Sequence, residues 1–236
     1  MHSKLPPKSA LNNPLRGPLR ELSAVQLPSE RPGQAGGKRD TNRRARTEGL
    51  LEAAQELFLA SGIEGVSIDD ITRQAGVAKG SFYRYFAGKE ELVRALLTPA
   101  RERVVSAFER CELGLRDGAS DADLNRAYLR LGRELLVALL GSPRVTRLYL
   151  QESRAPAVHA RVPVRELENE VARLALRVTE AAFSRGLIRR TPPEVSTLAV
   201  IGAAERLLTA YFAGALAIEP ALAVQGLVNL ILNGMR

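Results

Sequence analysis

The stretch SIDDITRQAGVAKGSFYRYF, residues 67–86, has the dimensions of two short helices joined by a sharp turn. Ser67 is a good N-cap, and Asp69 and Asp70 fall in the first turn, where acidic side chains favour the helix dipole. Gly76 can take the left-handed backbone angle that such a turn needs. The pattern therefore predicts a helix-turn-helix, whose second helix normally enters the major groove of DNA.

The second short helix, expected over residues 79–86, divides into an apolar and a polar side. Phe82 and Phe86 are expected in the core, and Tyr85 is expected to pack rather than to touch DNA. The other side chains suit phosphate or base contacts, because they carry cations and hydroxyls, and a glycine permits close backbone approach. This outward set consists of Lys79, Gly80, Ser81, Tyr83 and Arg84.

Amphipathic helices are predicted on both sides of this motif. From Thr41 onward, apolar residues recur at helical spacing up to Gly62, a plausible C-cap. A long fourth helix is expected from Gly88 to about Cys111. Pro99 falls inside it and removes one backbone hydrogen bond, so we expect a kink there or the junction of two helices.

The remainder of the chain reads as helices broken by proline and glycine, which predicts an all-α fold. Two of these helices, 194–213 and 220–233, are apolar around most of their circumference and must be buried on several sides. The expected helices are 121–140, 143–153, 163–185, 193–213 and 220–233.

Positive charge is concentrated at the N-terminus. Residues 1–47 hold ten Lys and Arg against three Asp and Glu, whereas the whole chain has a formal net charge of +8. Residues 1–40 are rich in Pro, Gly and Arg and are read as a disordered basic extension. Such a block fits a polyanion partner such as DNA, or a merely solvated tail, and the sequence leaves both readings open.

The inventory of reactive residues argues against an enzyme. Cys111 is the single cysteine and there are two histidines, so no thiolate zinc site is expected, and no cofactor is predicted. The chain contains none of the common phosphate-loop, nucleophile-elbow or zinc-protease motifs. No signal peptide and no uninterrupted apolar run long enough for a membrane span are found, so we expect a cytoplasmic protein without a membrane partner.

Residues 42–97 resemble the DNA-binding domain of the TetR family of transcriptional regulators. The resemblance rests on the run LLEAAQELFLASGIEGVSIDDITRQAGVAKGSFYRYFAGKEELVRALL, residues 50–97. The extension 1–40 is not part of the resemblance; after it, the resemblance implies a three-helix DNA-binding domain 41–90 and a larger helical ligand-binding and dimerisation domain 91–236. It also implies a sequence-specific repressor that binds a palindromic operator as a homodimer and responds to a small-molecule effector, with no enzymatic activity.

The resemblance also carries DNA contacts onto positions outside the second short helix. Ser67 caps the helix before the turn and can donate to phosphate, and Lys89 begins the fourth helix, where side chain and backbone N–H can both meet phosphate. Thr41, Arg43 and Arg44 lead into the first helix. For these arginines, a groove or backbone contact and a solvated charge run both remain open.

The C-terminal half offers candidates without a motif. Polar side chains in apolar surroundings predict a ligand pocket lined by Tyr128, Arg133, Tyr149, Glu152 and Tyr211. Glu205 lies in the most apolar helix and needs a partner if it is buried. By resemblance, the helices 194–213 and 220–233 form the dimer interface, although an intramolecular core would explain them as well.

Other functions share these motifs. A transcriptional activator or a corepressor-dependent regulator of the same fold would carry the same residues. A non-specific architectural DNA-binding protein would use the basic extension instead, and would show little sequence preference. The sequence does not identify the operator, the effector or the regulated genes.

Overall fold

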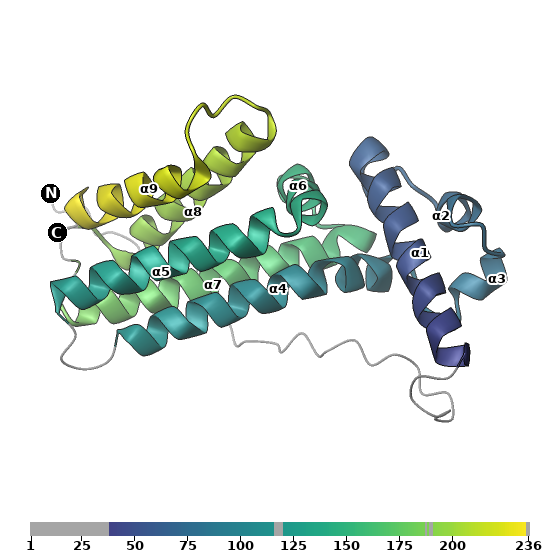
Figure 1. Ribbon diagram of the computed structural model, residues 1–236, viewed down its shortest axis with the longest axis horizontal. Coiled ribbons are helices and arrows are strands. Elements are labelled where there is room, and N and C mark those ends of the chain that lie inside the picture. The colour runs from purple at the N-terminus through teal and green to yellow at the C-terminus, as the bar shows by residue number, and fades with distance from the viewer. Residues whose placement is uncertain (1–37, 116–119, 187, 189–190, 235–236) are drawn as a thin grey trace, which may run out of the picture.

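The computed structural model describes residues 38–115, 120–186, 188 and 191–234, and every regular element in these ranges is a helix (Figure 1). The all-α prediction is therefore confirmed. The predicted extension over 1–40 lies outside the described residues except for its last three, which begin the first helix. The elements are α1 (Lys38–Ser61), α2 (Ile68–Gln74), α3 (Lys79–Phe82), α4 (Lys89–Gly114), α5 (Asp121–Leu140), α6 (Pro143–Glu152), the 3-10 helix η1 (His159–Arg161), α7 (Val162–Ser184), α8 (Pro193–Phe212) and α9 (Pro220–Gly234).

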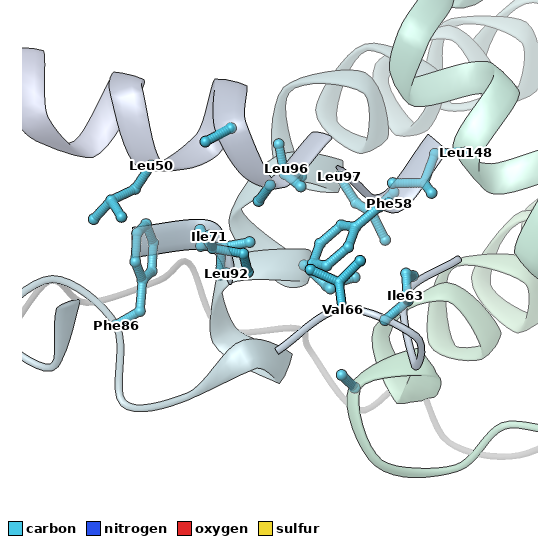
Figure 2. Packing of buried hydrophobic residues seen from close by; sticks show 14 of the residues in the cluster. Leu50, Phe58, Ile63, Val66, Ile71, Phe86, Leu92, Leu96, Leu97 and Leu148 are labelled. Atoms are coloured by element: carbon cyan, nitrogen blue, oxygen red, sulfur yellow. The ribbon is translucent and has the colours of Figure 1, made fainter. Parts of the chain in front are cut away.

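The helices α1, α2 and α3 form a small group at one end of the molecule, which we call the head (Figure 1). Gly62 and Gly76 end α1 and α2 with φ angles of 74° and 66°, so both turns use the left-handed region that glycine tolerates best. In the interior of the head, Phe58, Ile71 and Phe86 are at most 1% exposed (Figure 2). These residues belong to one apolar cluster, the head core.

The helix α3 is shorter than the predicted 79–86. After Phe82 the chain continues in tight turns, in which the amides of Arg84 and Tyr85 donate to the carbonyls of Ser81 and Phe82 over 3.2 and 2.8 Å. Phe82, Tyr85 and Phe86 are all buried. Their packing holds this segment, since four helical residues are too few to be stable on their own.

The long helices α4, α5 and α7 lie side by side and form the body of the molecule, with α8 and α9 against one side of them (Figure 1). α9 rests on α5 at Gly132, where an added Cβ would come within 2.5 Å of Val224 Cγ1. The close approach of the two helices therefore depends on the missing side chain of this glycine. Together with α4 and α7, the helices α5 and α9 form a second apolar cluster, the body core.

α4 connects the two cores. The head core includes α4 residues up to Leu97, and the body core includes α4 residues from Val104 onward. The division between the two apolar clusters therefore falls inside this helix. Pro99 lies between the two sets. The helix nevertheless runs through Pro99 without interruption, and the reading of two separate helices is wrong.

The outer helices α8 and α9 leave much of their apolar surface uncovered. Val195 and Leu198 on α8 are 56% and 57% exposed, and Leu222 and Leu230 on α9 are 59% and 69% exposed. Among the described helices, α8 is also the one whose length and mean hydropathy would suffice to cross a membrane, although Glu205 and Arg206 interrupt its apolar run, so the expectation of no uninterrupted apolar span holds. Its buried face nevertheless packs on α7 and lines a cavity that is partly open to solvent.

Candidate nucleic-acid interface and ligand cavity

The segment after the Gly76 turn presents polar side chains to solvent. Tyr83 is 52% exposed and Arg84 is exposed, whereas the flanking Phe82 and Tyr85 are buried. Lys79 and Gly80 are exposed and Ser81 is half-buried. The predicted division into a core side and an outward side is therefore present in the structure.

Lys79 has an acidic neighbour across the turn. Its ammonium Nζ lies 2.8 Å from a carboxylate oxygen of Asp69, and this hydrogen-bonded partner raises the pKa of Lys79. Both side chains are more than half exposed, and exposed ion pairs contribute little stability. The pair can therefore open when a phosphate approaches, and Lys79 stays cationic throughout the physiological range.

Ser67 forms a capping box with Asp70 at the start of α2. Its Oγ accepts from the Asp70 amide over 3.2 Å and donates to the Asp70 carboxylate over 2.5 Å, while the Ser67 amide donates to the same carboxylate over 3.0 Å. These bonds from Ser67 lower the pKa of Asp70. The hydroxyl predicted to donate to phosphate therefore donates within the protein, where it caps the start of α2.

The side chain of Lys89 is not available for the phosphate contact that was predicted for it. Its ammonium donates to the carbonyl oxygens of Ile63 and Val66 over 2.8 and 2.9 Å, and it lies 3.8 Å from a Glu64 carboxylate oxygen. The side chain is only 18% exposed, so it closes the loop between α1 and α2 instead of reaching outward. The physical reason is that this loop ends with carbonyls that need donors. Only the backbone at the α4 N-terminus remains suited to phosphate.

The N-terminal residues of the predicted interface lie in the first part of α1. Thr41 and Arg44 are exposed and Arg43 is half-buried. The structure therefore places them in a helix and not in a tail. A contact of these residues with DNA stays a prediction.

The body contains a cavity of about 260 Å³, partly open to solvent and lined by residues from α4 to α9. The lining is almost wholly apolar. Of the predicted pocket residues, Tyr128, Tyr149 and Tyr211 line it, whereas Arg133 and Glu152 do not. Arg133 is exposed on α5 and points away from the cavity, because the inward positions of that helix are taken by apolar residues.

Glu152 has a different place. It is 3% exposed at the end of α6, where its carboxylate accepts from Arg161 over 2.6 Å and from the Ile63 amide over 3.3 Å. The neighbouring Gln151 donates to the Phe58 carbonyl over 3.1 Å. These bonds fix α6 to the end of α1. Glu152 thus links the body to the head. This role could not be predicted from the sequence, because its partners lie far away along the chain.

Glu205 finds the partners that its position in α8 demands. Its carboxylate accepts from the Tyr149 hydroxyl over 3.1 Å and pairs with Arg154 over 2.7 Å. Burial and the Glu205 charge raise the pKa of Tyr149. A second charged group on the cavity wall, Arg101, is held by two 2.6 Å bonds to Glu170. Both charges at the cavity are therefore neutralised by protein partners.

The arrangement of α2, the Gly76 turn and the outward Tyr83 and Arg84 defines a helix-turn-helix transcriptional regulator. The family described as "Bacterial regulatory proteins, tetR family" matches residues 50–96. The transcriptional regulator EthR of Mycobacterium tuberculosis is 28% identical over 167 residues, which cover 70% of this chain and 74% of EthR. The transcriptional activator FasR of Mycolicibacterium smegmatis is 36% identical over 119 residues, 48% of this chain and 51% of FasR.

Solved structures agree on the fold. FadR of Bacillus subtilis in complex with stearoyl-CoA has a TM-score of 0.60 at 18% identity, over 80% of this chain and 99% of FadR. A TetR family member from Streptomyces coelicolor A3 also has a TM-score of 0.60, at 20% identity, over 79% of this chain and 90% of its own. Residues 50–96 therefore carry the DNA-binding domain of the TetR family of bacterial regulatory proteins, and the whole chain resembles TetR-family transcriptional regulators in fold.

Proposed function

We propose that this regulator is a homodimeric, ligand-responsive repressor that acts in the cytoplasm on a palindromic operator. The observation that carries the proposal is the pair Tyr83 and Arg84, exposed on a segment whose other face is locked into the head core. A rigid segment with outward hydroxyl and guanidinium groups suits phosphate and base-edge contacts. Lys79 adds a cation to the same segment.

The uncovered apolar face of α8 and α9 supports a second copy of this chain as partner. Val195, Leu198, Leu222 and Leu230 lie more than half exposed on these two helices. A face of that kind is costly in water and is typical of an obligate interface. A two-fold dimer also supplies the symmetry that two operator half-sites require.

The cavity supports an elongated apolar effector. Its wall offers aliphatic side chains, and its charged groups are already paired. The relative FadR binds stearoyl-CoA, whose long acyl chain has the apolar character that such a wall favours. We infer that an apolar chain of this general kind occupies the cavity of this protein.

Two elements join the cavity to the head and are suited to carry the response. α4 lines the cavity and continues through Pro99 into the head core. α6 lines the cavity with Thr146 and Tyr149, bonds α1 through Gln151, and bonds the turn after α1 through Glu152. A ligand that moves either helix therefore alters the position of the head. We expect Pro99→Ala to change effector-dependent release of DNA and to leave the fold intact; unchanged release would contradict a hinge at Pro99.

The experiment is a selection of operator sequences from random DNA with the full chain, followed by titration of the selected site. Arg84→Ala should weaken specific binding by about 1–3 kcal/mol if Arg84 reads a base. If Arg84 meets only phosphate, all sequences should weaken alike, and the salt dependence should become shallower. Arg126→Ala, which removes a 72% exposed arginine on α5, is the matched control and should bind normally.

Failure to enrich any sequence would overturn the proposal in favour of an architectural protein. Activation is the second candidate, because the relative FasR is an activator. Transcription in vitro from a promoter that carries the selected site distinguishes the two, since a repressor lowers transcript levels on binding and an activator raises them.

A further inference from the structure

The cavity extends along most of the length of α8. The residues of α8 that line it run from Ser196 to Tyr211. These two positions are separated by about 22 Å along the helix axis, since an α-helix rises about 1.5 Å per residue. On α9 the lining runs from Pro220 to Ile231. A volume of about 260 Å³ spread over such a length leaves a narrow passage, which suits one extended chain.

The two ends of the cavity differ in exposure. Near the start of α8, the lining residues Ile188, Ser196 and Thr197 are 1%, 2% and 1% exposed. At the other end, Tyr211 is 38% exposed and is the most exposed of the described lining residues. Leu216, in the connection between α8 and α9, also lines this end. The cavity therefore has a closed end near Ser196 and an open end at Tyr211.

Tyr128 on α5 belongs to the closed end. It lines the cavity and has as neighbours Thr179, near the end of α7, and Cys111, near the end of α4. α7 ends at Ser184, and α8 begins soon afterwards at Pro193. The last part of α7, the first part of α8 and Tyr128 therefore lie at the same end of the body.

The cavity wall offers no partner to a polar group that enters it. Arg101 and Glu205 are the charged lining residues within the described ranges, and each is bonded to other side chains. At the closed end, the hydroxyl oxygens of Tyr128, Ser196 and Thr197 have almost no accessible surface. A polar group placed there would lose its hydration without gaining a hydrogen bond, which is unfavourable. Only the open end leaves such a group in contact with water.

We propose that the cavity binds long-chain amphiphiles with a single polar end, and that they enter tail first. The methyl end lies near Tyr128, and the polar end stays outside the cavity at Tyr211. The proposal rests on the function proposed above, in which the cavity holds the effector. It adds a specificity: the size and charge of the polar group matter little, whereas a second polar group at the other end of the chain prevents binding.

Fluorescence quenching tests the orientation, because the chain contains no tryptophan. Tyr211→Trp and Tyr128→Trp each place a single reporter at one end of the cavity. The probes are two palmitates, one with bromine on the carbon beside the carboxylate and one with bromine on the terminal carbon. Since bromine quenches indole fluorescence only at short range, the terminal bromine should remove most of the fluorescence of Tyr128→Trp and little of that of Tyr211→Trp. The bromine beside the carboxylate should have the opposite effect.

Two further variants secure this result. Phe108→Trp, one turn of α4 before Cys111, is a second reporter near the closed end, for use if Tyr128→Trp fails to fold. Phe183→Trp is the control, since Phe183 is 41% exposed on α7 and is not part of the cavity lining. Neither probe should quench this control variant.

Binding affinities of the unmodified chain test the tolerance of the polar end, with displacement of a fluorescent apolar dye as readout. Palmitoyl-CoA and hexadecanol should bind within roughly threefold of palmitate, because their polar groups stay in water. Hexadecanedioate, which carries a carboxylate at both ends, should bind at least about tenfold more weakly than palmitate. One of its carboxylates must enter the closed end without a partner.

Equal quenching at both ends, or the reverse pattern, would overturn the orientation. So would hexadecanedioate binding as tight as that of palmitate, exclusion of palmitoyl-CoA, or no binding of any probe. If the probes bind in both directions, the cavity remains an effector site and only the tail-first entry fails. Absence of a selected operator together with the expected quenching would instead overturn the proposed regulator function and leave tail-first binding standing.

Discussion

The head and the body are both built from amphipathic helices, yet their packing differs. Phe58 in the head core is 0% exposed and surrounded by apolar neighbours, whereas Phe108 in the body core is nearly as well buried but lines the cavity. The head hides its apolar surface within one chain. The body leaves a hollow inside and an apolar face on α8 and α9 outside. The difference shows a head that is closed on itself and a body with uncovered apolar surface, which fits the proposal that the body binds a ligand and a second copy of the chain.

The largest effect should come from the two phenylalanines. Phe58→Ala should lower the free energy of unfolding by about 3–5 kcal/mol, because a large side chain is removed from a closed core. Phe108→Ala should lower it by roughly 2 kcal/mol, since one side of that ring already faces empty space. Equilibrium urea denaturation at one fixed protein concentration measures both. Equal losses would mean that the body is packed as tightly as the head.

The junction between the regions gives the next effect. Glu152→Ala should lower the free energy of unfolding by about 3 kcal/mol, because Arg161 and the Ile63 amide lose their buried partner. Arg144→Ala is the control, since its 3.6 Å pair with Glu56 also joins α6 to α1 but is more than half exposed. It should change stability by less than about 1 kcal/mol. A similar loss in both variants would contradict the distinction between a buried link and a surface pair.

Glycines test how closely helices must approach in each region. Gly132→Ala should destabilise the chain by about 1–3 kcal/mol and weaken self-association, because the new methyl group meets Val224 and displaces α9. Gly49→Ala in α1 meets nothing within 4 Å and should be neutral or slightly stabilising. Thermal unfolding and analytical ultracentrifugation provide the readouts. An unchanged dimer in the Gly132 variant would show that α9 can shift without consequence.

The smallest effect concerns two capping boxes, Ser67 with Asp70 in the head and Ser120 with Asp123 in the body. Ser67→Ala and Ser120→Ala should each lower the free energy of unfolding by about 1 kcal/mol at neutral pH. Only the first should also weaken DNA binding.

The pH dependence of the two boxes follows from their carboxylates. Hydrogen bonds from the serine lower the pKa of Asp70 and of Asp123 below the ordinary 3.8. The stability they add is therefore complete above that value and is lost as the pH falls through the lowered pKa. Denaturation of both serine variants across this acid range should show their difference from the native chain disappearing. A difference that persists in acid would show that the caps act without the carboxylates.

The sequence predicted most of the helices because their ends carry strong local signals. Pro143, Pro193 and Pro220 stand at first positions of helices, and Gly62 and Gly186 have φ angles of 74° and 68° where helices end. The predicted extent of α3 was less accurate, because tertiary packing rather than local hydrogen bonding holds that segment.

The sites were harder to predict, because side-chain partners come from distant parts of the chain. Lys89 turns to carbonyls more than twenty residues away, and Glu152 meets the Ile63 amide across a separation of 89 residues. No local signal marks Ser196 and Thr197 as part of the cavity lining. Only the inward apolar positions Val200 and Ala204, at helical spacing from Ser196, could have indicated that side of α8.

Hydroxyl-radical footprinting of the selected operator tests the central claim most directly, which is that two symmetric copies of the segment from Lys79 to Arg84 enter the major groove. The account predicts two protected half-sites related by a dyad, with centres about 34 Å or a multiple of it apart, and weaker protection of both for Arg84→Ala at a protein concentration that just saturates the native complex. A single asymmetric footprint, or unchanged protection by this variant at that concentration, would contradict it.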